Sequence, residues 1–275
     1  MCEFCVKHGE GKKWYLQMKN YSRELLESDG RQQYIQRFFT GFPERYARNQ
    51  QLLRFARRLG PAYSFIRTII SANLKRHHYG QVLPLEDVQA ILKEMTTVVR
   101  VACVCRMATI GRRQERFCYA LSINPTADPS LYPDLDGSLE ELSIEEAARQ
   151  IAKLDEEGLI HTVWTFGTPF IGGICNCDRN CLALRHHVFH QDFDVMFRGE
   201  YRAVVDVSQC IGCNQCLPRC EFDALTRYRA NRKVRVSPEN CYGCGVCRPV
   251  CPTGAIRLVP ARDTLPHGSL QSPSS

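Results

Sequence analysis

The sequences CIGCNQCLPRC (210–220) and CYGCGVCRPVCP (241–252) repeat one cysteine spacing near the C-terminus. Each copy has the form C-x2-C-x2-C-x3-C, which is the spacing that binds a 4Fe-4S cluster through thiolates. The first three cysteines of a copy reach one cluster, and the fourth ligates the other. The spacing therefore predicts two clusters with exchanged ligands: Cys210, Cys213, Cys216 and Cys251 for one, and Cys241, Cys244, Cys247 and Cys220 for the other.

This segment resembles the bacterial-type ferredoxin with two 4Fe-4S clusters, over about residues 200–260. Short alternating stretches before each copy and after the second have the pattern of strands. The resemblance implies two strand–helix–strand halves related by an approximate twofold axis. Four-cysteine zinc sites, the alternative, would show paired CxxC motifs instead of triple runs. Glu221 departs from the family, which has proline there as at Pro252, and we expect it to make the two clusters electronically unequal.

The chain has 275 residues, enough for two domains, and 16 cysteines, more than an ordinary cytosolic protein carries. Because cluster ligands must stay thiolates, the tandem motifs favour a compartment with little oxygen over an oxidising one. No apolar run reaches the ~20 residues that span a bilayer, and the N-terminal sequence has charges where a signal peptide needs an apolar stretch. We therefore expect a cytoplasmic protein of an anaerobic setting, without a transmembrane segment.

The predicted fold class is α+β, with four regions. Residues 1–80 form a basic helical region that begins with a CxxC pair, Cys2 and Cys5. Residues 81–199 form a mixed α/β domain, and residues 200–262 form the ferredoxin-like dicluster domain. The polar tail, 263–275, is predicted to be disordered.

Charge is distributed unevenly along the chain: residues 1–80 carry a net +9, residues 81–199 a net −6 and residues 200–275 a net +4. Between Arg45 and Arg76 there are eight basic residues and no acidic one, interleaved with apolar residues at helical spacing. We interpret this stretch as a helical hairpin whose apolar stripe packs on the middle domain; a protein partner or an anionic membrane are the alternatives. The basic ferredoxin-like domain favours an acidic redox partner, whereas peripheral membrane contact is less favoured and no nucleic acid is expected.

The middle region contains well-signalled helices and strands. Proline at 84 opens one helix, while Ser143 and Glu146 form the capping box of a second, which Gly158 ends. The pattern of TTVVRVACVCR (96–106) predicts a strand that places Cys103 and Cys105 on one face. Cys118 is predicted on the strand that returns beside it.

A second group of cysteines lies in this middle region. The motifs CVCR, EEGLIH and ICNC resemble a pattern that accompanies ferredoxin domains in uncharacterised iron–sulfur proteins of anaerobic microbes. Together with the polar loop after the last motif, they predict a third iron–sulfur cluster; buried structural cysteine is the alternative. The candidate ligands are Cys105, Cys118, Cys175, Cys177 and Cys181, with Cys103 in reserve and with Cys2, Cys5, His161, His186, His187 and His190 less favoured.

These features favour an iron–sulfur electron-transfer protein that carries low-potential electrons one at a time between redox partners, alone or in an oxidoreductase complex. One alternative is a redox enzyme or enzyme subunit, whose middle-domain iron–sulfur site binds substrate and is fed by the ferredoxin domain. A redox or metal sensor is the second alternative. The sequence names no catalytic residue for these alternatives. It has no phosphate loop, dinucleotide glycine fingerprint or nucleophile elbow, so bound ATP, NAD or flavin is unsupported.

Overall fold

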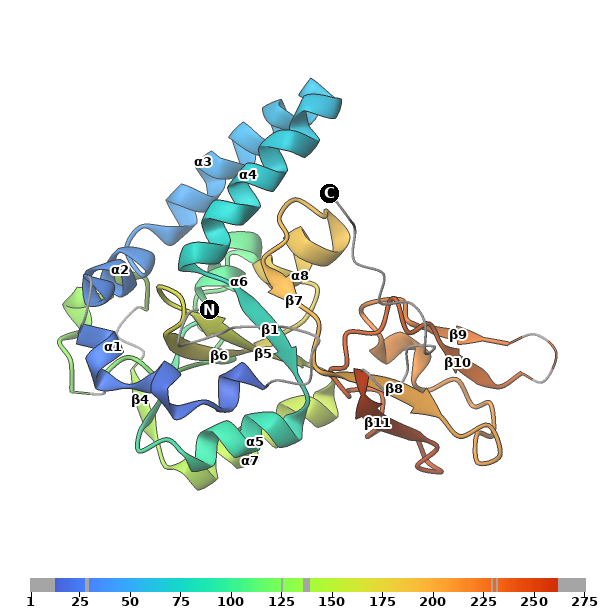
Figure 1. Ribbon diagram of the computed structural model, residues 1–275. Helices are drawn as coiled ribbons and strands as arrows, with labels where there is room; N and C mark the ends of the chain where they lie inside the picture. Colours follow the sequence, from blue (N-terminus) through green and yellow to red (C-terminus); the bar gives the residue numbers. More distant parts are fainter. Residues whose placement is uncertain are drawn as a thin grey trace.

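The computed structural model describes residues 13–27, 30–124, 126–135, 139–228, 230 and 232–261, so Cys2, Cys5 and the tail 263–275 lie outside the described residues. Helices and strands are mixed along the chain, in agreement with an α+β class (Figure 1). The α-helices are α1 (Arg23–Glu27), α2 (Arg31–Phe38), α3 (Phe42–Ala56), α4 (Pro61–His77), α5 (Leu85–Lys93), α6 (Val104–Ile110), α7 (Ile144–Glu157) and α8 (Leu182–Leu184). The strands are β1 (Gly80–Leu83), β2 (Val98–Val101), β3 (Cys118–Ala120), β4 (Glu140–Leu142), β5 (Ile160–Thr165), β6 (Ile171–Cys177), β7 (Met196–Phe197), β8 (Tyr201–Val205), β9 (Leu225–Arg227), β10 (Val234–Val236) and β11 (Ile256–Pro260).

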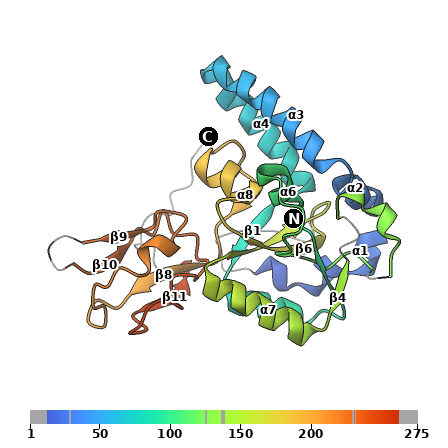
Figure 2. The same ribbon diagram turned by 180° about the vertical axis from the view of Figure 1, so that it is seen from behind.

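Seven strands form one sheet in the order β4-β2-β3-β6-β5-β1-β7. Neighbouring strands are antiparallel, except that β1 and β7 run parallel. Helices α5 and α7 cover one face of the sheet, and α6, α8 and the α3–α4 pair lie on the other (Figures 1 and 2). Every residue of β5 is buried, as a strand covered on both faces must be. The sheet is therefore the middle layer of three.

The signals for α7 are confirmed. Ser143 and Glu146 exchange the two hydrogen bonds of a capping box, and Gly158 ends the helix in the left-handed conformation at φ 94°. Ala147, Ile151 and Leu154 are buried on one side of the helix, at the spacing that a helix packed on a sheet requires. Helix α5 likewise begins directly after the proline at 84.

The predicted strand through Cys103 and Cys105 is wrong beyond Val101. Strand β2 pairs with β3 only as far as Val101, and the Cys103 N–H donates instead to the carbonyl of Glu115. Helix α6 begins at the next residue, so Cys105 lies in its first turn. Alternating apolar residues fit a short strand, but they also fit the start of a buried helix, and tertiary packing decides between the two.

The N-terminal region shares the core of the middle domain. Trp14 and Tyr15 are completely buried. Trp14 Nε1 donates to Gln81 Oε1 at 2.5 Å, and the Tyr15 hydroxyl donates to Asp87 Oδ2 at 2.7 Å. Helix α2 and the residue that follows it, Phe39, pack on the face of the sheet opposite to α5. Ile35 and Phe39 are the buried residues there. Residues 13–39 and the middle domain are therefore packed as one unit, across the boundary predicted at residue 80.

Helices α3 and α4 form the predicted hairpin, which projects beyond the sheet in both views (Figures 1 and 2). Its base packs on α6, and Arg57 forms a two-pronged ion pair with the buried carboxylate of Asp192, with contacts of 2.6 and 2.7 Å. The prediction that the apolar stripe packs on the middle domain is wrong for part of the stripe, which stays exposed although Arg57, Tyr63 and Arg67 near the turn of the hairpin contact Gln191 and Asp192. The exposed apolar side chains are Leu52 (64%), Phe55 (66%), Leu59 (45%), Phe65 (70%) and Ile69 (55%).

The C-terminal segment folds around two short antiparallel ribbons. Strand β8, before the first cysteine motif, pairs with β11, which follows the second motif. Strand β9, after the first motif, pairs with β10, which precedes the second. The two motifs therefore occupy equivalent places in the domain. No helix among the described parts of the chain is both long and apolar enough to cross a membrane.

Two adjacent glycines in β6 provide a matched test of packing in the sheet. A Cβ at Gly172 would lie 2.2 Å from Phe166 Cδ2, whereas a Cβ at Gly173 would meet nothing closer than 3.4 Å. We expect Gly172→Ala to lower the free energy of unfolding by about 1–3 kcal/mol, the usual cost of overpacking, and Gly173→Ala to lower it less. The urea midpoint of the cluster-loaded protein measures the difference, and equal midpoints would contradict the close approach of Phe166 to Gly172.

Candidate iron–sulfur sites

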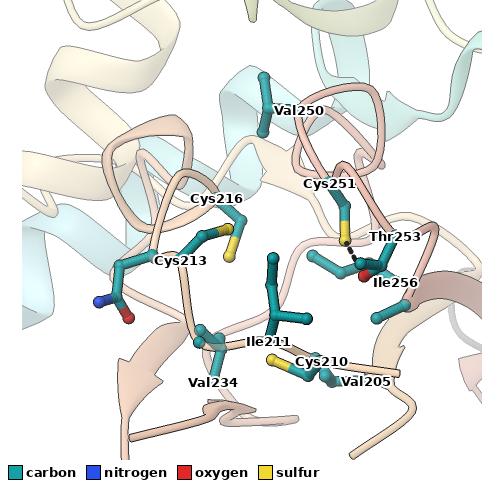
Figure 3. Close-up of a pocket in the computed structure, with 13 residues that line it drawn as sticks. Val205, Cys210, Ile211, Cys213, Cys216, Val234, Val250, Cys251, Thr253 and Ile256 are labelled. Carbon is teal, nitrogen blue, oxygen red and sulfur yellow. Dashed lines mark hydrogen bonds between the residues drawn. The ribbon is translucent and has the colours of Figure 1, made fainter. Parts of the chain in front are cut away.

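The first ferredoxin cysteine group surrounds a small pocket (Figure 3). Cys210, Cys213 and Cys216 come from the loop after β8, and Cys251 comes from the loop before β11. The side chain of Cys213 is exposed, and Ile211 beside it is 67% exposed. The structure thus brings together the four cysteines that the spacing assigned to one cluster, at a place open to solvent.

The second ferredoxin group is more enclosed. Cys241, Cys244 and Cys247 are buried, and Cys220 is half-buried. Burial raises the pKa of Cys247 to about 12, with further contributions from the negative charges of Cys241 and Cys220. Burial also raises the pKa of Cys220, and Cys241 adds to it. Burial likewise raises the pKa of Cys244, with contributions from Cys247, Cys241 and Cys220.

Backbone N–H groups point at sulfur atoms in the second group. The Ala203 N–H donates to Cys241 Sγ and the Ala224 N–H donates to Cys220 Sγ, both at 3.3 Å. Such bonds stabilise thiolates and tune the potential of a bound cluster. In the first group, burial opposes ionisation of Cys251, but hydrogen bonds from Thr253 lower its pKa below the ordinary value. Both groups therefore have the donor atoms and surroundings that suit a four-iron cluster.

The loops of the two groups have the same backbone shape. Gly212 and Gly243 each precede the second cysteine of a motif, with φ of 71° and 73°. A Cβ would lie 2.8 Å from Arg232 O at Gly212 and 2.3 Å from Tyr201 O at Gly243. Only glycine combines this left-handed conformation with so close an approach to neighbouring backbone.

The second group lies at the interface with the sheet domain. Phe222, Cys244 and Val246 are buried in the same hydrophobic core as the residues of β5 and α7. Tyr242 stacks on Phe222 with ring centroids 4.0 Å apart and an interplanar angle of 9°. The ferredoxin domain is therefore docked through the loop that carries its buried cysteines.

Ion pairs between the domains compensate the charges next to the ligands. Arg248 forms a two-pronged pair with Glu86 of α5, at 2.5 and 2.8 Å. Glu221, expected to make the clusters unequal, pairs with Arg179 at 2.8 Å. The Arg219 side chain lies against Gly158 at the end of α7. The charges of Glu221 and Arg248 are thus balanced by pairs that the sequence did not predict.

The six cysteines of the middle domain gather between the sheet and the helices above it. Cys118 of β3 lies directly opposite Cys175 of β6, and Cys177 is two residues further along the same face. The helical layer supplies the other three, and all six are free of disulfides. Those three are Cys103 before α6, Cys105 in its first turn and Cys181 before α8.

Hydrogen bonds connect these thiols in pairs. Cys118 Sγ donates to Cys103 Sγ at 3.3 Å, and Cys118 also contacts Cys175, as Cys177 contacts Cys181. Burial, together with the charges of Cys181 and Cys103, raises the pKa of Cys105. The structure thus brings together all six cysteines that the sequence suggested, including Cys103.

Arg106 is buried beside the middle-domain cysteines, and the sequence did not predict its burial. It is 4% exposed, pairs with Glu115 at 2.8 Å and Asp178 at 3.0 Å, and lies over the Phe117 ring. Although burial lowers the pKa of Arg106, the charge of Cys181 and the carboxylate of Asp178 raise it overall. Its Nε is buried without a hydrogen-bond partner among the described residues. An arginine beside a cysteine in the sequence carries no sign of burial, so the CVCR motif alone could not reveal it.

The histidine candidates are engaged elsewhere. His161 is buried between Asn176 Oδ1 at 2.6 Å and Asp155 Oδ1 at 3.2 Å, on the sheet face opposite the cysteines. His186 contacts Asp192 Oδ2 at 2.7 Å, and His187 bonds to a backbone carbonyl. These histidines hold elements together and lie apart from the thiols.

Within the described ranges, no group of three or more histidine, cysteine, aspartate or glutamate side chains is arranged to hold a single metal ion. The same is true of the eight ferredoxin cysteines, whose expected cofactor contains four irons.

No curated protein matches the chain. Residues 203–258 match the sequence model of a family described as a 4Fe-4S dicluster domain, so the C-terminal segment is a ferredoxin-like iron–sulfur domain.

Proposed function

We propose that this chain carries low-potential electrons one at a time between redox partners through two 4Fe-4S clusters, and that its middle domain adds a further metal site. The main support is the gathering of Cys210, Cys213, Cys216 and Cys251 around one pocket, within the segment that matches the dicluster family. A bound 4Fe-4S cluster stores and releases one electron at a potential set by burial, hydrogen bonds and nearby charge. The thiolates need a reducing surrounding, in keeping with the cytoplasmic location expected from the sequence.

The two cysteine groups would have different roles, one facing an external partner and the other facing the sheet domain. The exposed Cys213 makes the first group the one that an external partner can approach. The buried Cys244 makes the second group the one that faces the sheet domain. An exposed entry beside an enclosed site suits a protein that receives electrons from outside and passes them inward.

The external partner is proposed to be acidic. Residues 224–238 contain five basic residues and no acidic one. They include the β9–β10 hairpin, in which Arg227, Arg232 and Arg235 are exposed. This hairpin contacts the first cysteine loop, because Lys233 Nζ donates to Val207 O and the Arg232 backbone packs on Gly212. The positive charge of this hairpin therefore lies beside the exposed group, where it would attract and orient an acidic protein.

The exchange of ligands between motifs can be tested by comparing spectra of variants. If Cys251 shares a cluster with Cys213, Cys251→Ser and Cys213→Ser should leave the same residual cluster, with the same electron paramagnetic resonance spectrum after reduction. Cys220→Ser and Cys247→Ser should leave the other cluster and a different spectrum. A Cys251→Ser spectrum that matches Cys247→Ser would instead show that each motif binds its own cluster.

Two arginines that adjoin the proposed ligands, Arg219 and Arg248, are expected to influence the cluster potentials. A unit charge about 10 Å from a cluster is worth roughly 1 kcal/mol at an effective dielectric constant of about 30, or about 40 mV for a one-electron couple. Removing a positive charge lowers a potential, so Arg219→Gln should shift one midpoint down by some tens of millivolts. Arg248→Gln also removes one positive charge, since Glu86 is present in both proteins, and we expect a downward shift of similar size. Potentiometric titration gives both values, and unchanged midpoints would exclude charge as a control of potential.

The basic hairpin predicts a salt-dependent reaction with an acidic donor. Replacing Arg227 and Arg235 by Glu should slow reduction by a small acidic ferredoxin about tenfold at low salt, with the difference lost near 1 M salt. The matched control, Arg58→Glu with Arg76→Glu on the α3–α4 hairpin, changes the net charge equally but leaves the exposed cysteine group untouched. Equal slowing in both variants, measured by stopped flow, would show a net-charge effect and remove the proposed docking face.

A further inference from the structure

The six middle-domain cysteines come from four separate stretches of chain but occupy one place in the fold. The sheet supplies Cys118, Cys175 and Cys177, and the helical layer supplies the other three. Structural cysteines behave as small hydrophobes, and nothing in that role requires thiols to contact one another. Here Cys103 and Cys118 lie with their sulfurs 3.3 Å apart. Convergence of this kind is typical of ligands that surround a metal centre.

We propose that these six cysteines form the binding site of a third iron–sulfur cluster, an inference that rests on the proposed electron-transfer function. Four thiolates hold such a cluster. Cys177 and Cys181 each supply one ligand. The sheet pair Cys118 and Cys175 supplies one, and the pair beside α6 supplies the fourth, so that each of these two pairs has one spare thiol. The α6 pair is Cys103 and Cys105.

Neighbouring groups complete the site. The Phe117 N–H donates to Cys103 Sγ at 2.9 Å, as backbone donors do in the ferredoxin domain. The guanidinium of Arg106 is almost completely buried, and its Nε has no hydrogen-bond partner among the residues described. A buried N–H without an acceptor is costly, and a cluster sulfur or cysteine thiolate would provide the acceptor. These groups favour a negatively charged sulfur-rich cofactor over empty thiols.

The location connects this site to the ferredoxin domain. Cys177 and Cys181 belong to the same hydrophobic core as Cys244, and the half-buried Cys220 packs against that core. The third site would therefore adjoin the buried ferredoxin group through continuous apolar packing that excludes water. Electrons received at the exposed group would then have a destination inside the chain.

The test is the iron and sulfide content of the full chain, reconstituted without oxygen. The full chain is required because the core of the sheet domain includes Phe222 and Val246 of the ferredoxin domain. Three clusters give about twelve irons and twelve sulfides per chain, whereas two give about eight. The variant Cys177→Ser with Cys181→Ser should bind about eight and retain the spectra of both ferredoxin clusters. Cys2→Ser with Cys5→Ser, which also removes two thiols, should still bind about twelve.

The outcomes separate this inference from the function on which it rests. Wild-type protein with about eight irons and both ferredoxin spectra would overturn the third cluster and leave electron transfer intact. The same iron content with one zinc per chain would overturn it in favour of a zinc site. Fewer than eight irons, with a ferredoxin spectrum missing, would count against the proposed function itself. The wild-type measurement decides these cases even if the double variant does not fold.

Discussion

The contact on which the molecule depends is the packing of one ferredoxin loop into the core of the sheet domain. Cys244 and Val246 of this loop are buried there with residues of β5 and α7, and Phe222, which follows the first cysteine motif, is buried in the same core. Apolar burial contributes about 25 cal/mol for each Å² removed from water, so this loop is held by the same force as the sheet itself. Because this loop carries three cysteines of the second motif, the docking that joins the domains also encloses one cysteine group and leaves the other open.

Electrostatics follow from that docking. At the interface Arg248 meets Glu86 and Arg179 meets Glu221, so charge next to the enclosed group is balanced. Beside the exposed group, residues 224–238 contain five basic residues and no acidic one. A paired inner surface and a basic outer one have different consequences. The first fixes the potential of a site, and the second acts over a distance on whatever approaches.

Features that depend on residues close together in the sequence could be predicted. Features that depend on contacts between distant residues could not. The ferredoxin motifs and the capping box of α7 lie within a few residues, so their spacing carries the geometry. The turn of the chain after Val101 depends on the bond from Cys103 to Glu115, which no local pattern encodes. The projection of the α3–α4 hairpin was missed for a related reason. An apolar stripe at helical spacing predicts a face that can be buried, whereas long-range packing decides which residues of that face are buried.

The same distinction explains why the two kinds of cysteine site differ in how they can be recognised. In the ferredoxin domain, the first three cysteines of each motif share one loop. Gly212 fixes the shape of the first loop and Gly243 that of the second, so each group can be recognised as a sequence motif. In the middle domain the register of β3 against β6 places Cys118 beside Cys175, and the packing of α6 and α8 on that face brings the rest. Such a site exists only when the sheet has formed. The positions of its cysteines are therefore coupled to the stability of the whole domain, and a cofactor bound there would stabilise the sheet and both helices together.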